Sequence, residues 1–193
     1  MFSNSNFQNL LNNSNLYLKV SPDWNSSIEN HRLLLRKSLA LELTQNGYSG
    51  SDLQEVLNLN KIPKLLNGSA SISHCPLAGG WALSLGHEKQ IGFDLEVASK
   101  ISSAVVVRMG SEAELELAPG PAQLWAGKEA TFKSLLGPTQ PVVLSQIRIT
   151  NWRTESSNLW QFTAQIQGVT RGECYGVVAI KDDLVMGISQ FEA

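Results

Sequence analysis

Cysteine and long apolar runs are both scarce in this sequence of 193 residues, and each absence excludes a class of protein. The two cysteines, Cys75 and Cys174, are too few for a disulfide framework or a zinc cluster. No apolar run approaches the roughly 20 residues that cross a bilayer as a helix. The first 15 residues are rich in Asn and Ser and lack the basic start and apolar core of a signal peptide. We therefore expect a cytoplasmic protein that does not insert into a membrane.

Charged residues are also fewer than average, because they make up 17% of the chain and leave a net charge of −2. A general nucleic-acid binder normally carries a basic excess, so we expect no nucleic-acid partner. Apolar residues, at 42%, are sufficient for the core of one domain or of two small lobes. From this length we also expect a monomer.

Hydrophobic periodicity predicts a mixture of strands and helices. Alternation at period two indicates strands at residues 16–20, 69–74, 81–86, 91–96, 143–149, 160–166, 175–181 and 184–189. Apolar spacings of three and four indicate helices at residues 27–45, 51–59 and 123–136, with a shorter amphipathic segment at 111–117. Residues 1–15 show no such pattern, and we expect a loose lead-in there.

Two pairs of predicted strands are joined by short polar turns, which is typical of antiparallel hairpins. The first hairpin spans residues 81–96 and the second spans residues 175–189. Their similar form indicates a faint internal duplication. We therefore predict an α+β fold of two pseudo-duplicated lobes, residues 1–100 and 101–193, each with a small antiparallel sheet and a long helix.

The strand predicted at 91–96 alternates apolar residues with small or acidic ones, so Asp94 and Glu96 share one face. Two carboxylates one step apart repel each other unless a positive group lies between them. Mg²⁺, which prefers oxygen ligands and usually shares them with a phosphate, would satisfy that need. An edge strand with a solvated acidic face is the alternative, and from these residues alone it is the better explanation.

A third carboxylate lies in the helix predicted at 123–136. Trp125, Glu129 and Phe132 fall on one stripe of this helix, so we expect Glu129 on its packed side. A carboxylate there needs a partner, because burial otherwise drives it to take up a proton. Lys133, one turn further on, could form an ordinary i,i+4 ion pair with Glu129.

Three motifs in order closely resemble the signatures of the 4′-phosphopantetheinyl transferase superfamily. They are Ser71-Ile72-Ser73-His74, Ile91-Gly92-Phe93-Asp94-Leu95-Glu96 and Trp125-Ala126-Gly127-Lys128-Glu129-Ala130-Thr131-Phe132-Lys133. The family forms are S-x-S-H, (I/V)-G-(I/V)-D-x-E and W-x-x-K-E-A-x-x-K. The resemblance covers roughly residues 30–190, and the chain length is similar to that of the two-lobe, Sfp-type branch.

The resemblance implies an enzyme that transfers 4′-phosphopantetheine from coenzyme A to a serine of an acyl or peptidyl carrier protein. Such carriers serve fatty-acid or secondary-metabolite synthesis. By this resemblance, Asp94, Glu96 and Glu129 would ligate Mg²⁺ at the pyrophosphate of the coenzyme. Lys133 would hold a pyrophosphate oxygen, and Glu129 would also act as the base for the incoming serine hydroxyl.

The resemblance also implies a set of contacts with coenzyme A. These contacts would come from Arg32, Lys64, Ser73, His74, Lys128 and Lys133. Ser73 and His74 would meet the phosphates or the ribose, and Arg32 and Lys64 the 3′-phosphate or the adenine side. For His74, a strand-end histidine satisfied by the backbone is the alternative, and for Arg32 it is a solvated surface arginine.

Three other functions are compatible with the same residues. A non-catalytic member of the fold would bind coenzyme A or a carrier protein without transfer. A metal-dependent phosphohydrolase would release phosphopantetheine into water. An α+β domain with a structural ion site would leave coenzyme A unaltered.

Overall fold

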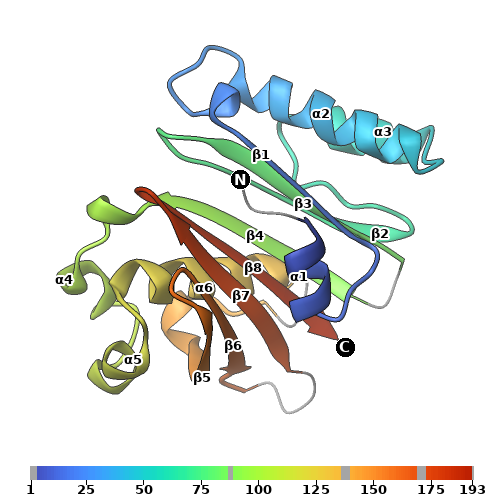
Figure 1. Cartoon of the computed structure of the whole chain (residues 1–193). Coiled ribbons are helices and arrows are strands. Elements are labelled where there is room, and N and C mark those ends of the chain that lie inside the picture. Colours follow the sequence, from blue (N-terminus) through green and yellow to red (C-terminus); the bar gives the residue numbers. More distant parts are fainter. Residues whose placement is uncertain (1–3, 87–88, 136–139, 169–172, 193) are drawn as a thin grey trace.

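The computed structural model describes residues 4–86, 89–135, 140–168 and 173–192, and it confirms the predicted α+β class. The described residues form six α-helices and two antiparallel sheets (Figure 1). The helices are α1 (Asn4–Leu10), α2 (His31–Gln45), α3 (Ser51–Leu57), α4 (Ser103–Val106), α5 (Glu112–Leu117) and α6 (Pro121–Ser134). The strands are β1 (Leu16–Ser21), β2 (Gly68–His74), β3 (Gly79–Leu85), β4 (Lys89–Val97), β5 (Ile147–Ser156), β6 (Leu159–Ile166), β7 (Cys174–Lys181) and β8 (Leu184–Glu192).

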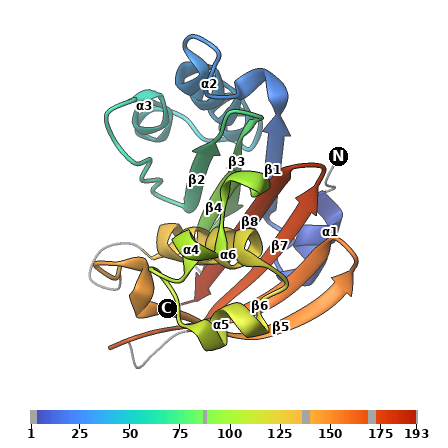
Figure 2. The same ribbon diagram turned by 90° about the vertical axis from the view of Figure 1, so that its left-hand side faces the viewer.

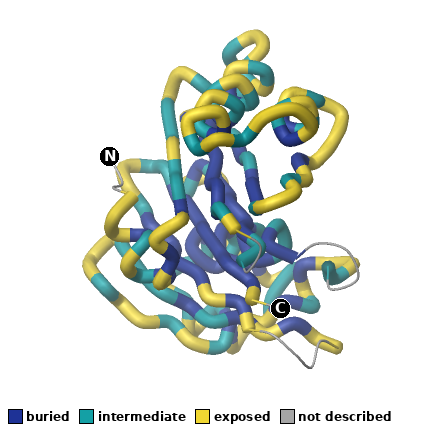
Figure 3. The backbone as a smooth tube through the Cα atoms, turned by 90° about the vertical axis from the view of Figure 1, so that its right-hand side faces the viewer, coloured by how far each residue is buried: buried dark blue, intermediate teal, exposed yellow. Residues whose placement is uncertain are grey.

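The smaller sheet has the strand order β1-β3-β2, and α2 and α3 cover its outer face (Figures 1 and 2). Three leucines of α2, spaced four residues apart, bury against Trp81 and Leu83 of β3. These leucines are Leu35, Leu39 and Leu43. Figure 3 shows the exposed outer surface of the two helices above the buried strands. The spacing of the leucines therefore explains why this helix lies flat on this sheet.

The larger sheet has the order β4-β8-β7-β6-β5 and carries α6 on one face and α1 on the other (Figure 1). Glycines allow α6 to approach closely. A Cβ atom on Gly92 of β4 would lie 1.9 Å from the carbonyl oxygen of Ala130, and one on Gly187 of β8 would lie 2.3 Å from that of Ala126. The helix backbone therefore rests directly on these two strands, which fixes α6 above β4.

The two sheets are joined by side chains. The hydroxyl oxygens of three alternate serines of β2 accept hydrogen bonds from the backbone amides of three alternate residues of β4. The pairs are Ser69 with Ile91 (2.9 Å), Ser71 with Phe93 (2.9 Å) and Ser73 with Leu95 (3.1 Å). We call this set of three bonds the serine ladder. It satisfies amides on the edge of β4 that faces away from β8.

Most predicted elements are confirmed, including the hairpin of β7 and β8. The hairpin predicted at residues 81–96 is wrong, because β3 lies between β1 and β2 whereas β4 pairs with β8. Strand pairing thus crosses the predicted lobe boundary at residue 100. The loose lead-in is also wrong, because α1 buries Phe7 in the core beneath β4 and β8.

Helix α6 differs from its prediction in the side that it buries. Its buried residues are mostly small, and they include Ala126, Gly127 and Ala130, whereas Trp125 and Glu129 are only partly buried. The large apolar side chains of the predicted stripe therefore do not mark the packed face. The helix ends at Ser134, two residues before the predicted end, and the glycine and proline expected to close it lie outside the described residues. Within the described ranges, no helix has both the length and the apolar character needed to span a bilayer.

Candidate functional site

Strand β4 presents its acidic residues as the alternation predicts. Phe93 and Leu95 are buried in the apolar cluster that also contains Phe7 of α1. Asp94 and Glu96, one position out of phase, therefore lie on the other face, the one that α6 covers. Asp94 is only 2% exposed, and Glu96 is partly buried. The solvated acidic edge considered above is thus excluded for Asp94.

Asp94 is held by two partners from different elements. Its Oδ1 accepts a hydrogen bond from Lys133 Nζ of α6 at 2.6 Å and another from Ser73 Oγ of β2 at 3.1 Å. Its Oδ2 is buried and has no hydrogen-bond partner among the described residues. A buried carboxylate oxygen without a partner is rare in folded proteins, and it is where a cation or a donor from a ligand would bind.

Glu96 and Glu129 lie close enough to Asp94 for its charge to act on both. Burial raises the pKa of both carboxyl groups, and the negative charge of Asp94 raises each pKa further. Glu129 also acts on Glu96 in the same direction, while Lys133 opposes the shift of both. The three carboxylates therefore lie within one another's fields. The i,i+4 ion pair of Glu129 with Lys133 is absent from the ion pairs of the described residues, because Lys133 pairs with Asp94.

The donor set fits Mg²⁺ in its chemistry, since it offers three carboxylates and an unpartnered Oδ2. The spacing is more open than that of a finished site. No three His, Cys, Asp or Glu side chains in the described part of the chain are gathered closely enough to hold a metal ion. The residues that would hold Mg²⁺ are Asp94, Glu96 and Glu129, and the ammonium of Lys133 already pairs with Asp94 Oδ1.

His74 lies on the opposite face of β2 from Ser73, against the start of α2. Its ring centroid is 4.5 Å from that of His31 in an edge-to-face arrangement. Burial lowers the pKa of His74, and the positive fields of His31, Arg32 and Lys133 lower it further. His74 Nδ1 and His31 Nε2 are both buried without a hydrogen-bond partner in the described ranges. The backbone of His74 itself partly offsets the lowering of its pKa, which is the one observation in favour of a histidine satisfied by backbone.

The two remaining predicted contacts from the N-terminal lobe, Arg32 and Lys64, are placed differently from each other. Arg32 is exposed on α2, and its charge acts on His74. Lys64 is exposed in the loop before β2, where it lines a separate pocket with Lys61 and Glu55. The structure thus brings Arg32 near the site but leaves Lys64 in another pocket.

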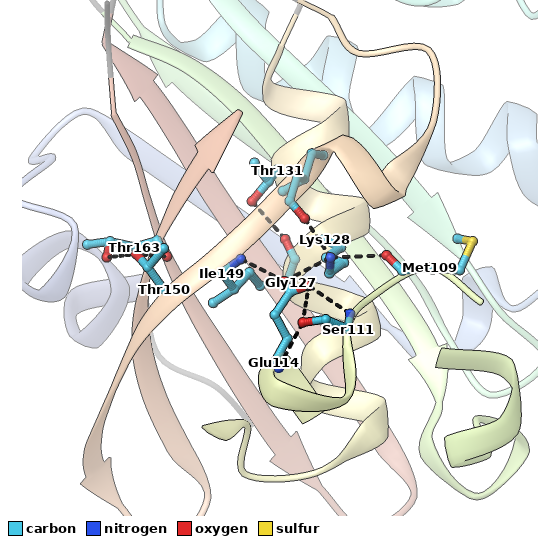
Figure 4. Close-up of polar contacts among 10 residues, drawn as sticks. Met109, Ser111, Glu114, Gly127, Lys128, Thr131, Ile149, Thr150 and Thr163 are labelled. Carbon is cyan, nitrogen blue, oxygen red and sulfur yellow. Dashed lines mark hydrogen bonds and ion pairs between the residues drawn. The ribbon is translucent and has the colours of Figure 1, made fainter. Parts of the chain in front are cut away.

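The ammonium of Lys128 is bound by groups of the protein itself (Figure 4). Its side chain is 1% exposed, and its ammonium contacts Glu114 Oε1 at 2.9 Å and the backbone oxygens of Met109 and Ile147 at 3.1 and 2.5 Å. An ammonium has three donors, so none remains for a ligand. The expected contact of Lys128 with coenzyme A is therefore not part of the site proposed below.

Sequence reasoning missed three contributors to this region. His31 is the first residue of α2, and no pattern in the sequence indicates that it meets His74. The indole of Trp125 partly offsets the rise in the pKa of Glu96, although its Nε1 has no hydrogen-bond partner among the described residues. Ser69 extends the motif of Ser71 and Ser73 by one more alternate serine, and this regular spacing was a signal that could have been used.

Comparison with known proteins adds no relative. The chain matches no model of a known family and none of the curated proteins. The family resemblance therefore depends on the three motifs and on the geometry that joins them.

Proposed function

We propose that this protein is a Mg²⁺-dependent 4′-phosphopantetheinyl transferase of the two-lobe type. It would transfer phosphopantetheine from coenzyme A to a serine of an acyl or peptidyl carrier protein. The fold in this proposal is the pseudo-duplicated one, with coenzyme A between the two lobes. The α+β class and the two antiparallel sheets are compatible with that arrangement.

The observation that carries the proposal is the convergence of three motifs on one oxygen atom. Oδ1 of Asp94, in the D-x-E motif, binds Ser73 of the upstream motif and Lys133 of the helix motif. These residues are 21 and 39 positions away from Asp94 in the sequence. Contact of three motif segments at one buried carboxylate supports the proposal, because these segments are far apart in the sequence.

Each of these residues has its own role in the proposed reaction. Asp94, Glu96 and Glu129 would hold Mg²⁺, which supplies charge neutralisation at the pyrophosphate when bound. Glu129 takes the proton from the carrier serine, and its raised pKa makes it a better base near neutral pH. The serine oxygen bonds to the phosphorus next to pantetheine, and the phosphoanhydride bond breaks. Adenosine 3′,5′-bisphosphate leaves with the electron pair of that bond.

Lys133 would position the coenzyme by binding a pyrophosphate oxygen. Its side chain is 30% exposed, so its ammonium is open to a ligand while it contacts Asp94. His74 and Arg32 lie on the N-terminal side of this region and remain the proposed contacts for the ribose and phosphates. Lys64 remains a prediction for the adenine side, although it lies in its own pocket.

The test is a transfer assay with purified components. The protein, coenzyme A, Mg²⁺ and a panel of apo carrier proteins are incubated, and each carrier is measured by intact mass. A gain of one phosphopantetheine, lost when EDTA is added or when the target serine of the carrier is replaced by alanine, supports the proposal. An unchanged mass for every carrier, with the protein folded, contradicts it.

A non-catalytic protein that binds coenzyme A or a carrier is the second candidate. The specific observation in its favour is that Lys133 occupies Asp94 while the three carboxylates stay apart. Calorimetry distinguishes the two functions. Binding of coenzyme A that is indifferent to Mg²⁺, together with no transfer, would favour the binding protein.

A further inference from the structure

All three serines of the serine ladder accept a hydrogen bond from β4, but they differ in the other hydrogen bonds that they make. Ser69 and Ser71 each accept one hydrogen bond from an amide of β4. Ser73 does the same for Leu95, but its hydroxyl also donates to Asp94 Oδ1 and accepts from Lys133 Nζ at 3.3 Å. The last serine of the ladder therefore connects the joint between the sheets to the acidic site.

The hydrogen-bonding capacity of Ser73 is fully used by these contacts. A hydroxyl has one proton to donate and two lone pairs. The proton goes to Asp94, and the lone pairs receive Leu95 N–H and Lys133. Ser73 is also 8% exposed. The direct contact with coenzyme A that the family resemblance implies would break one of these bonds.

We propose that Ser73 is a positioning residue that fixes the carboxylate of Asp94 for the metal. With Oδ1 held by Ser73 and Lys133, the carboxylate cannot rotate freely, and Oδ2 stays as the oxygen without a protein partner. Partners of this kind, outside the metal ligands themselves, typically change metal affinity by about 10- to 100-fold. This inference rests on the proposed function, in which Asp94 ligates Mg²⁺.

The serine ladder also explains how Ser73, from the smaller sheet, can position Asp94 of the larger sheet. β2 presents Ser73 to Asp94 on one face and His74 to His31 on the other. The spacing of β2 and β4 is fixed by Ser69 and Ser71 as well, so Ser73 meets Asp94 at a set distance. The position of the carboxylate thus depends on the alignment of the two sheets.

Ser69 provides a matched control for the experiment. Ser69→Ala and Ser73→Ala each remove one hydroxyl that accepts a β4 amide, but only Ser73 contacts Asp94. Mg²⁺ affinity is measured by calorimetry in the presence of coenzyme A, and the free energy of unfolding is measured in urea. We expect Ser73→Ala to lose more stability than Ser69→Ala, because it removes three hydrogen bonds rather than one. Only Ser73→Ala should weaken Mg²⁺ binding, by about tenfold, and Ser73→Thr should restore it.

The outcome does not depend on finding the right carrier, because Mg²⁺ binding is measured without one. Equal Mg²⁺ affinities of Ser69→Ala and Ser73→Ala, or no Mg²⁺ binding by the wild-type protein, would overturn the inference. Failure of the wild-type protein to modify carriers while Ser73→Ala still weakens Mg²⁺ binding would instead count against the transferase alone. If Ser73→Ala does not fold, Ser73→Cys keeps the size of the side chain with a weak hydrogen-bonding group and should give the same loss.

Discussion

Lys133 Nζ of α6 lies 2.6 Å from Asp94 Oδ1 of β4, so a lysine from one motif neutralises a buried carboxylate from another. The contact joins the helix to the edge strand of the larger sheet, over the glycine that lets them approach. It also explains how the Asp94 carboxylate can be buried, with 2% of the residue exposed, although Glu96 and Glu129 lie nearby. The pair thus has a role in stability as well as in the proposed chemistry.

Replacing Lys133 by methionine should lower both stability and transfer. The change leaves Asp94 buried without its cation, and we expect a loss of about 2 to 3 kcal/mol in the free energy of unfolding, less than for a fully buried pair because Lys133 is partly exposed. Lys61→Met is the control, because Lys61 forms a solvent-exposed pair with Glu55 at 3.6 Å and should cost less than about 1 kcal/mol. Urea unfolding at pH 7 measures both. Equal losses would contradict the assigned role of the Asp94 pair.

Glu129→Gln tests the proposed base. The amide cannot take the proton of the carrier serine, so kcat should fall by at least about 100-fold. The KM for coenzyme A should change little, because Glu129 is not a proposed contact for the adenosine part. Glu116→Gln on the exposed side of α5 is the control and should retain wild-type rates. A Glu129→Gln enzyme with normal turnover would refute the base assignment.

The pH dependence of stability follows from the raised pKa values of Glu96 and Glu129. A carboxyl group whose folded pKa lies above its unfolded pKa of about 4.5 is charged at a cost in the folded state near neutral pH. That cost is relieved as the pH falls through the folded pKa, and it vanishes below the unfolded pKa. Glu96→Gln and Glu129→Gln should therefore each stabilise the protein at pH 7 and have little effect at pH 4.

Urea unfolding of the wild type and the two variants at both pH values checks this prediction. Glu112→Gln, at an exposed position of α5, serves as the control for a general change in net charge. Destabilisation by either of the two site variants at pH 7 would show that the carboxylates are better satisfied than their burial and mutual repulsion indicate.

Lys128→Met should destabilise the protein without affecting the affinity for coenzyme A. The variant leaves Glu114 charged and 5% exposed between α5 and β5, and breaking such a pair typically costs about 3 to 5 kcal/mol. Glu114→Gln added to Lys128→Met should recover part of the loss, since the amide oxygen still accepts from Ile149 and the unpaired charge is gone. Thermal unfolding measures stability, and calorimetry measures coenzyme binding. A selective loss of coenzyme affinity in folded Lys128→Met would instead support a contact between Lys128 and coenzyme A, which the burial of Lys128 argues against.

The sequence was sufficient for most elements, although not for α1, and it predicted the pairing of β7 with β8 but not that of β4. Period-two alternation predicted β4 and placed Asp94 and Glu96 on one face, because that pattern is local. The partner of β4 is β8, some 90 residues away, and a nearby strand looked like the simpler partner. Local turn signals cannot report that the free edge of β4 is satisfied by serine side chains.

The two lysines of α6 show a second limit. Lys128 and Lys133 are both basic residues of one motif, yet one is buried with Glu114 and the other reaches Asp94. The buried residues of α6 are mostly alanine, glycine and small polar residues, which allow close approach to β4 and β8. Because hydrophobic periodicity assigns the core side to large apolar residues, it selected the wrong face and could not separate these lysines.

Gly92→Ala should break the geometry on which the site depends. The new Cβ would lie 1.9 Å from the carbonyl oxygen of Ala130 and 2.4 Å from the amide of Ser134, both backbone atoms of α6 that cannot rotate away. The helix must then move off β4, at a cost of about 3 kcal/mol or more. Gly110→Ala is the control, because its Cβ would meet Glu114 Oε2 at an ordinary 3.4 Å. Urea unfolding gives the loss in stability, and Mg²⁺ calorimetry reports whether Asp94 and Glu129 still act together. A Gly92→Ala protein with wild-type stability would mean that α6 does not rest on this strand, and the convergence of the motifs on Asp94 would fail with it.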